Sequence, residues 1–273
     1  MPISPQPSSN AAFLLDRYIE RWSLRPDGSP IIGNNAVVQP VLTADGEAAM
    51  LRVAPGSTSF HDEVLALSIW DGDGAVRLYD HDAAEGAMLL ERLDHKRNLD
   101  SVPIDEAATV AGRLRARLSR PAPDGLPTVE SLAAGWVTEL SQNRTLPKRI
   151  IDAAVGICRE LAAGTNKYLV NDDQHYHNVL AGSREPWLVI DPRVYAGDRE
   201  FGLATLLWGR LHESSTQGIL NILIDAEGLD ADKARAWTFV GAVTKWASAP
   251  RPVVARNCAT IAHDLSAQSR PAR

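Results

Sequence analysis

The sequence has little cysteine, no dense run of basic residues and no long apolar stretch. Its 273 residues contain only two cysteines, Cys158 and Cys258, which lie far apart and are expected to be buried thiols. Net charge is −6 without a Lys/Arg-rich run, which argues against a protein that mainly holds a nucleic-acid backbone. No apolar run approaches the roughly 20 residues that span a bilayer, and the N-terminus lacks a signal-peptide profile. We therefore expect a cytoplasmic protein with no membrane and no nucleic-acid partner.

The first third of the chain has the pattern of strands with one helix. The Asp-Gly pair at positions 45–46 separates two apolar runs and is typical of a β-hairpin. Apolar residues at helical spacing predict a helix over Phe60–Trp70. The ten opening residues are polar and Pro/Ser-rich, and we expect them to be loosely held. The predicted strands are 36–42, 48–53, 75–79 and 87–93.

The remainder is mostly helical, interrupted by one strand–loop–strand insert. Helical periodicity covers 104–118, 128–140 and 146–163, and strand-like runs return between 168 and 195, including 178–181 and 187–190. The last N-terminal strand ends near Asp94, and the length suits two lobes. Periodicity alone thus predicts an α+β fold with two lobes, at 1–94 and 95–273.

Three side chains in the insert have the pattern that phosphoryl transfer needs. That reaction uses a carboxylate to orient the attacking hydroxyl, and a carboxamide with a second carboxylate to hold Mg²⁺. Four residues separate Asp173 from Asn178, and Asp191 follows the second strand of the hairpin that comes next. An Asp pair such as Asp172-Asp173, taken alone, more often only caps a turn. The spacings along the sequence from Asp173 to Asn178 and Asp191 favour a role in phosphoryl transfer over a turn cap.

The segments Asn171–Leu180 (NDDQHYHNVL) and Val189–Ala204 (VIDPRVYAGDREFGLA) resemble the HGDLHxxNVL…IDP motif of aminoglycoside phosphotransferases. They are most similar to the branch that contains streptomycin 6- and hydroxyurea phosphotransferases. Trp70–Leu78 (WDGDGAVRL) resembles that branch's WDGxGAVRLL signature, so the likeness covers roughly residues 36–211. It implies a protein-kinase-like fold, with a small β-rich nucleotide-binding N-lobe and a larger, mainly helical C-lobe that carries the catalytic loop and the substrate-binding helices.

The resemblance also implies roles for single residues. In the C-lobe, Asp173 would be the catalytic base, and Asn178 and Asp191 would bind magnesium. In the N-lobe, a helix glutamate would anchor a phosphate-binding cation, and a hinge backbone would bind adenine. These residues would be Glu63 with Arg52, and Glu91 to Leu93.

Four positions depart from the family pattern. Asn171 replaces a histidine that normally supports the catalytic loop, and Asp172 replaces glycine beside the base. Arg52 stands where the family has lysine, which is not a conservative exchange, and Gly202 stands where it has aspartate.

We therefore expect an ATP- or GTP-dependent, Mg²⁺-dependent kinase that phosphorylates a hydroxyl of an antibiotic or similar small polar molecule, as a monomer or homodimer. The departures motivate an alternative, a degenerate kinase fold that binds a nucleotide or small ligand without catalysis. A third interpretation is an iron site made by His175, His177 and Asp173, since two histidines two residues apart would share one side of an extended strand. The acidic stretch 225–232 either faces a cationic substrate or is a solvated loop beside a helix.

Overall fold

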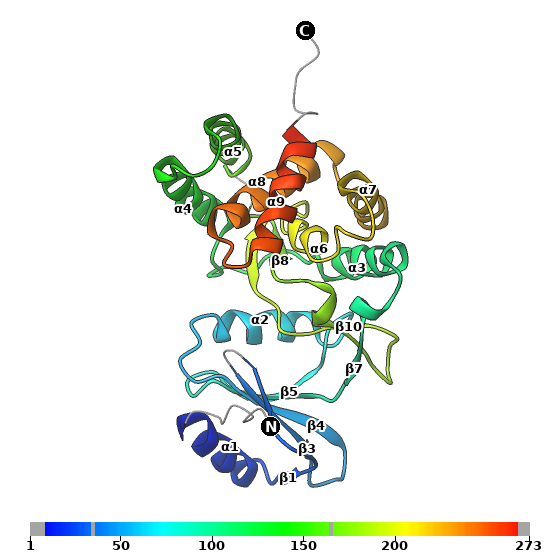
Figure 1. The fold of residues 1–273 in the computed structure, drawn as a ribbon. Helices are drawn as coiled ribbons and strands as arrows, with labels where there is room; N and C mark the ends of the chain where they lie inside the picture. The colour runs from blue at the N-terminus through cyan, green and yellow to red at the C-terminus, as the bar shows by residue number, and fades with distance from the viewer. Residues whose placement is uncertain (1–8, 34–35, 164–165, 267–273) are drawn as a thin grey trace. The chain divides into compact units, whose positions relative to one another are not determined.

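The computed structural model describes residues 9–33, 36–163 and 166–266, which divide into two compact units. Unit 1 runs to His95 and also takes in Ala181–Leu188, a segment from much later in the chain. Unit 2 contains Lys96–Leu180 and the chain from Val189 onward. Unit 1 is built on a β-sheet and unit 2 is mainly helical (Figure 1), so the predicted α+β class is confirmed.

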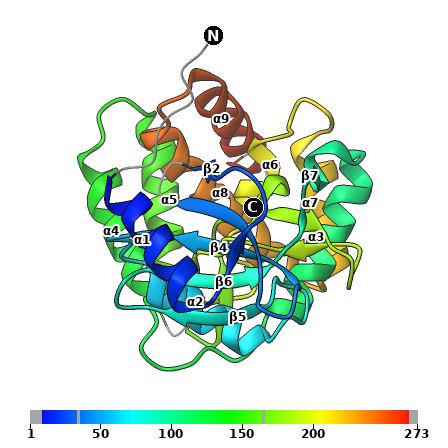
Figure 2. The ribbon, with the colours of Figure 1, turned by 90° about the horizontal axis from the view of Figure 1, so that it is seen from below.

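Unit 1 is an antiparallel sheet with a helix on each face. Helix α1 (Ser9–Arg21) packs apolar residues on one face, and α2 (Phe60–Trp70) lies on the other (Figures 1 and 2). Helix α1 was not predicted. Of the ten opening residues that were expected to be loosely held, 1–8 lie outside the described residues, whereas Ser9 and Asn10 begin this helix. The strands in spatial order are β1 (Arg25–Pro26), β3 (Val37–Leu42), β4 (Ala48–Val53), β6 (Ala87–Glu91) and β5 (Leu78–Asp82), and β2 (Ile31–Ile32) pairs with β3.

Alternation along β4 directs its side chains to the two helices. Ala49, Leu51 and Val53 are fully buried in the cluster that includes α1. Because successive residues of a strand point to opposite faces, Arg52 points to the other side, where it meets α2.

Local signals placed most of these elements correctly. Strands β3 and β4 form the predicted hairpin, with Leu42 opposite Ala48 and Gly46 at a φ of 84° in the turn. Helix α2 has the predicted bounds. The predicted strand 75–79 was partly wrong, because β5 begins only at Leu78. The carbonyl of Ala75 instead accepts a hydrogen bond from the Arg184 side chain, at 3.1 Å.

Unit 2 packs helices around a two-stranded antiparallel ribbon. The ribbon joins β8 (Tyr168–Asn171) to β11 (Val194–Gly197), with Asn171 opposite Val194. This register places the loop that follows Asn171 beside the residues that precede Val194. The helices are α3 (Ile104–Leu118), α4 (Val129–Gln142), α5 (Lys148–Leu161), α6 (Ala204–Trp208), α7 (Thr216–Glu227), α8 (Ala231–Ser248) and α9 (Pro252–Ser266).

Short elements complete the description. Two 3₁₀ turns, η1 (Leu99–Ser101) and η2 (Tyr176–Asn178), lie in unit 2. Strands β7 (Asp94–Asn98), β9 (Val179–Ala181) and β10 (Leu188–Val189) pair in the order β10-β9-β7. Among the described helices, none combines the length and the hydropathy that a membrane crossing requires.

Candidate active site

The loop after β8 is organised by the side chain of Asn171. Its Oδ1 accepts the backbone N–H of Asp173 at 3.0 Å and that of Arg193 at 3.1 Å. One buried carboxamide therefore fastens together the loop that carries Asp173 and the segment that leads into β11. Asn171 stands where the family has histidine, and its short side chain at the end of β8 reaches both amides.

Asp173 and Asn178 are joined through the same loop. The Asn178 side-chain nitrogen donates to the backbone carbonyl of Asp173 at 3.1 Å, and the N–H of His175 donates to that carbonyl at 3.0 Å. The Asp173 side chain is half-buried, whereas Asn178 is buried. With its nitrogen committed to the loop, Asn178 presents Oδ1 as the atom able to bind a cation.

Asp191 comes close to Asn178 through the backbone. The N–H of Ile190 donates to the carbonyl of Asn178 at 2.9 Å, and Asp191 is the next residue. Asp191 is exposed and has a φ of 49°, a left-handed conformation that non-glycine residues rarely adopt. Such backbone strain gathers at functional sites. The carboxamide and carboxylate oxygens of this pair are hard donors of the kind that Mg²⁺ prefers, so the residues present fit that ion.

The two histidines of the loop do not form the iron site considered above. His177 lies within η2 and His175 immediately precedes it, so neither is on an extended strand, and their rings meet edge to face at 5.9 Å. His177 is exposed, 3.6 Å from Asp100, and burial lowers the pKa of His175. In the parts of the chain that the structure describes, no three His, Cys, Asp or Glu side chains are grouped to hold a metal.

Asp172, the residue before the predicted base, is paired with an arginine. Its Oδ2 accepts a hydrogen bond from Arg193 Nη2 at 2.8 Å. Burial raises the pKa of Asp172 to about 6, although the guanidinium opposes this, and the neighbouring charge of Asp173 raises it further.

In unit 1, the structure brings the predicted pair Arg52 and Glu63 together. Arg52 Nη1 lies 2.9 Å from Glu63 Oε2, and the two side chains are 13% and 4% exposed. A glutamate this buried is not a solvated surface residue of α2. It holds the guanidinium on the face of the sheet that α1 does not cover.

The predicted hinge residue Glu91 is held by an arginine that the sequence analysis missed. Arg184 donates to both carboxylate oxygens of Glu91, at 2.9 and 3.3 Å, and to the carbonyls of Gly72 at 2.7 Å and Ala75 at 3.1 Å. This explains the WDGDGAVRL signature, whose turn places carbonyl oxygens around one guanidinium. The backbone N–H of Glu91 already donates to Arg77, and Leu93 is buried, 8% exposed.

Comparison with known proteins shows the family of this chain. The family model for aminoglycoside/hydroxyurea antibiotic resistance kinases matches residues 21–251. The chain belongs to this family. It is 37% identical over 230 residues to a hydroxyurea phosphotransferase of Kitasatospora aureofaciens, which covers 81% of this chain and 68% of that protein. It is 34% identical over 241 residues to a streptomycin 6-kinase of Streptomyces glaucescens, which covers 83% of this chain and 78% of that protein.

Solved structures share the fold at low sequence identity. A choline kinase of Streptococcus pneumoniae has a TM-score of 0.62 at 13% identity, covering 95% of this chain and all of that one. A spectinomycin phosphotransferase, solved with ADP and spectinomycin, has a TM-score of 0.57 at 11% identity, covering 97% and 96%. The predicted protein-kinase-like fold is confirmed, and the protein is a small-molecule kinase that uses a nucleotide as phosphate donor. No finding favours the non-catalytic alternative.

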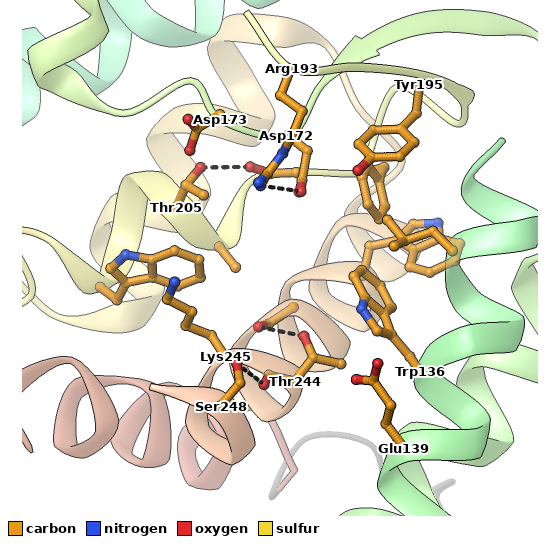
Figure 3. A pocket seen from close by; sticks show the side chains of 17 residues that line it. Trp136, Glu139, Asp172, Asp173, Arg193, Tyr195, Thr205, Thr244, Lys245 and Ser248 are labelled. Carbon is orange, nitrogen blue, oxygen red and sulfur yellow. Dashed lines mark hydrogen bonds and ion pairs between the residues drawn. The ribbon is translucent and has the colours of Figure 1, made fainter. Parts of the chain in front are cut away.

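Unit 2 of this kinase contains a cavity of about 290 Å³ beside Asp173. Figure 3 shows Asp172, Asp173 and Arg193 on one side of it, with Lys245 of α8 on another side. These are the residues around which an acceptor molecule could bind within reach of a base.

Aromatic rings make much of the cavity wall. Phe201 is stacked on Trp136 at 5.9 Å between ring centroids, and meets Trp237 and Tyr195 edge to face at 5.4 and 6.3 Å. All four rings line the cavity. Trp136 and Trp237 therefore belong to the cavity wall, and Trp237 is also a core residue, 2% exposed.

Proposed function

We propose that this kinase transfers the γ-phosphoryl group of ATP or GTP to a hydroxyl of a small polar molecule, with Asp173 as the catalytic base. The observation that supports it best is the position of Asp173. It lines the cavity, and one loop links it by hydrogen bonds to Asn178, the neighbour of Asp191. A carboxylate placed in this way can accept the proton of an acceptor hydroxyl as the bond to phosphorus forms.

Asp172 does not compete for this role. Its carboxylate is tied to Arg193, and its pKa of about 6 leaves part of it protonated near neutral pH. Asp172 lines the same cavity as Asp173, but its carboxylate is committed to Arg193 and would not act as the base.

Asn178 and Asp191 would hold Mg²⁺. When bound, the ion supplies positive charge to the phosphate oxygens. The chain's own contribution is to fix the two oxygen donors: the Asn178 amide by its bond to the Asp173 carbonyl, and Asp191 by the bond between Ile190 and Asn178.

The nucleotide contacts are assigned to unit 1. Arg52, held by Glu63, would neutralise the α- and β-phosphates with its planar guanidinium. The backbone of Glu91 to Leu93 would bind the base. The N–H of Glu91 already donates to the carbonyl of Arg77. We therefore assign the carbonyl of Glu91 and the N–H of Leu93 to this contact.

The acceptor belongs to the class named by the relatives, an antibiotic or a similar polar metabolite. One relative is named for hydroxyurea and another for streptomycin. The ring wall around Phe201 suits a flat or sugar-like body, whose apolar faces pack on aromatic rings while its hydroxyls bond to the polar residues.

The first experiment is thermal unfolding with ATP and GTP, with and without Mg²⁺, on the wild type and on Asp191→Ala. A nucleotide at a hundredfold excess over its dissociation constant stabilises the fold by about 2.7 kcal/mol. We expect a shift that needs Mg²⁺ and is lost in the variant. Phosphorylation assays would then use aminoglycosides, nucleoside antibiotics and hydroxyamides. A kinase that shows no nucleotide shift and phosphorylates none of these would contradict the proposal.

A further inference from the structure

Arg115 of α3 forms several buried hydrogen bonds with the catalytic segment, although no sequence motif marks this residue. Its guanidinium donates to Glu227 Oε2 at 2.7 Å and to three backbone carbonyls, those of Asn171 at 3.3 Å, Arg199 at 3.0 Å and Phe201 at 2.6 Å. The Arg115 side chain is 4% exposed. The planar guanidinium thus holds the end of β8 and the turn before α6 together through their carbonyl oxygens.

The placement of Glu227 shows that this cluster has a cost. Glu227 is the last residue of α7, where the helix dipole disfavours a negative charge, and its side chain is completely buried. Burial raises the pKa of its carboxyl, against the influence of Arg115. Gly112 allows this arrangement, because a Cβ there would lie 2.8 Å from the Cβ of Ala226, so α3 can approach the end of α7.

Gly202 leaves room for the cluster. It has a φ of 86°, and a Cβ at this position would lie 2.8 Å from the carbonyl oxygen of Asn171 and 3.5 Å from Arg115 Nη1. The family motif that this segment resembles has aspartate at the position of Gly202. In this chain, the space that such a side chain would fill holds the Asn171 carbonyl and the guanidinium that binds it.

We propose that Arg115 is a positioning residue for Asp173, an inference that rests on the proposed role of Asp173 as base. Arg115 fixes the Asn171 carbonyl, and the Asn171 side chain fixes the amides of Asp173 and Arg193. The direction of the Asp173 carboxylate therefore depends on a guanidinium that touches neither the cavity nor the nucleotide contacts.

The test compares Arg115→Lys with Leu223→Ala, a matched control on α7. Lysine keeps the charge opposite Glu227 but cannot reach three carbonyls. Leu223 is fully buried on the same helix as Glu227, and its hydrocarbon side chain forms no hydrogen bond. At a temperature where both variants are folded, Arg115→Lys should lose about 10- to 100-fold in kcat, with KM for the nucleotide within about twofold of wild type. The control should keep its kcat, and equal kcat in both variants would overturn the proposal.

A second measurement does not need activity. Amide hydrogen exchange over residues 171–178 should rise in Arg115→Lys, and in Gly202→Ala, which presses on the same carbonyl, but not in Leu223→Ala at similar global stability. Equal exchange in the three variants would make Arg115 a structural residue only. If the wild type phosphorylates no acceptor while exchange rises selectively, the proposed function fails and the positioning role stands.

Discussion

Two arginines, one in each unit, bind their surroundings in the same way but differ in burial. Arg184 of unit 1 bonds to Glu91 and to two loop carbonyls, and its side chain is 24% exposed. Arg115 of unit 2 bonds to Glu227 and to three carbonyls, and its side chain is 4% exposed. Water can partly replace a partner lost in unit 1, whereas a partner lost in unit 2 leaves an uncompensated buried charge.

The two arginine clusters lie beside different parts of the proposed active site. The Arg184 cluster includes Glu91, part of the backbone to which we assign the nucleotide base. The Arg115 cluster supports the loop that carries Asp173. Disturbing the first should act mainly on nucleotide affinity, and disturbing the second mainly on the rate of phosphoryl transfer.

The largest effect should come from the base itself, in unit 2. Asp173→Asn should lower kcat about 10³-fold, because the asparagine amide cannot accept the hydroxyl proton. The shift in melting temperature caused by MgATP should persist, since Asp173 is not among the proposed nucleotide contacts. Steady-state kinetics and thermal unfolding check both points. A larger loss in Asp172→Asn than in Asp173→Asn would show that the wrong carboxylate has been assigned.

Breaking the unit 1 cluster should have a smaller effect of a different kind. Arg184→Ala leaves the Glu91 carboxylate with little compensation, which should lower the free energy of unfolding by about 1–3 kcal/mol and raise KM for the nucleotide. Urea unfolding and ATP titrations measure these quantities. The double variant Arg184→Ala/Glu91→Gln removes the charge and should recover part of the stability. A fall in kcat without any change in KM would contradict the division of tasks.

A pH effect should distinguish Asp172 from the strongly paired carboxylates. Its pKa is raised from 3.8 to about 6 in the folded protein, so between these values the folded state holds more protons than the unfolded state. The contribution of Asp172 to stability should therefore fall as pH rises from about 4 to 6 and then level off, a cost of up to about 3 kcal/mol. Asp172→Asn should be more stable relative to wild type at pH 7 than at pH 4, as measured by chemical unfolding. The opposite trend would mean that the Arg193 pair outweighs burial.

The smallest effect concerns the charge of the acceptor. Lys245 Nζ lies 5.5 Å from the centroid of the Trp208 ring, beside the cavity. Removing this charge in Lys245→Met should lower KM for a cationic acceptor roughly threefold and leave KM for a neutral acceptor unchanged. Lys148→Met, at an exposed position on α5, serves as the charge-matched control. Equal changes for both acceptors would place Lys245 outside the acceptor site.

Elements with local signals could be predicted from the sequence. The Asp45-Gly46 turn marked its hairpin, and helical spacing gave α2 and α3 the bounds that the structure has. Asp173 and Asn178 likewise lie in one loop, so their spacing can be seen in the sequence. Each of these patterns is complete within a few residues of the chain.

The two arginine clusters could not be predicted, because their partners are far apart in sequence. Arg115 and Glu227 are 112 positions apart, and Glu91 and Arg184 are 93 apart. Glu227 lies in an acidic stretch that was expected to face substrate or solvent, and it does neither. The packing of α3 on α7 pairs Glu227 with Arg115, and this packing leaves no periodic pattern in the sequence. The contacts of Asn171 similarly depend on the register of β8 with β11, so the sequence could not show what replaces the family's histidine.

The late segment Ala181–Leu188 has a consequence for how the chain is made. Unit 1 contains it, so the N-terminal sheet leaves the ribosome before the arginine that closes its glycine-rich turn has been added. At about 5–20 residues per second, the 93 positions between Glu91 and Arg184 take roughly 5 to 20 s to synthesise. During that time the Glu91 carboxylate must stay hydrated or form an ion pair with another cation. The first unit to emerge is thus completed only after residues Lys96–Leu180 of unit 2 have been made.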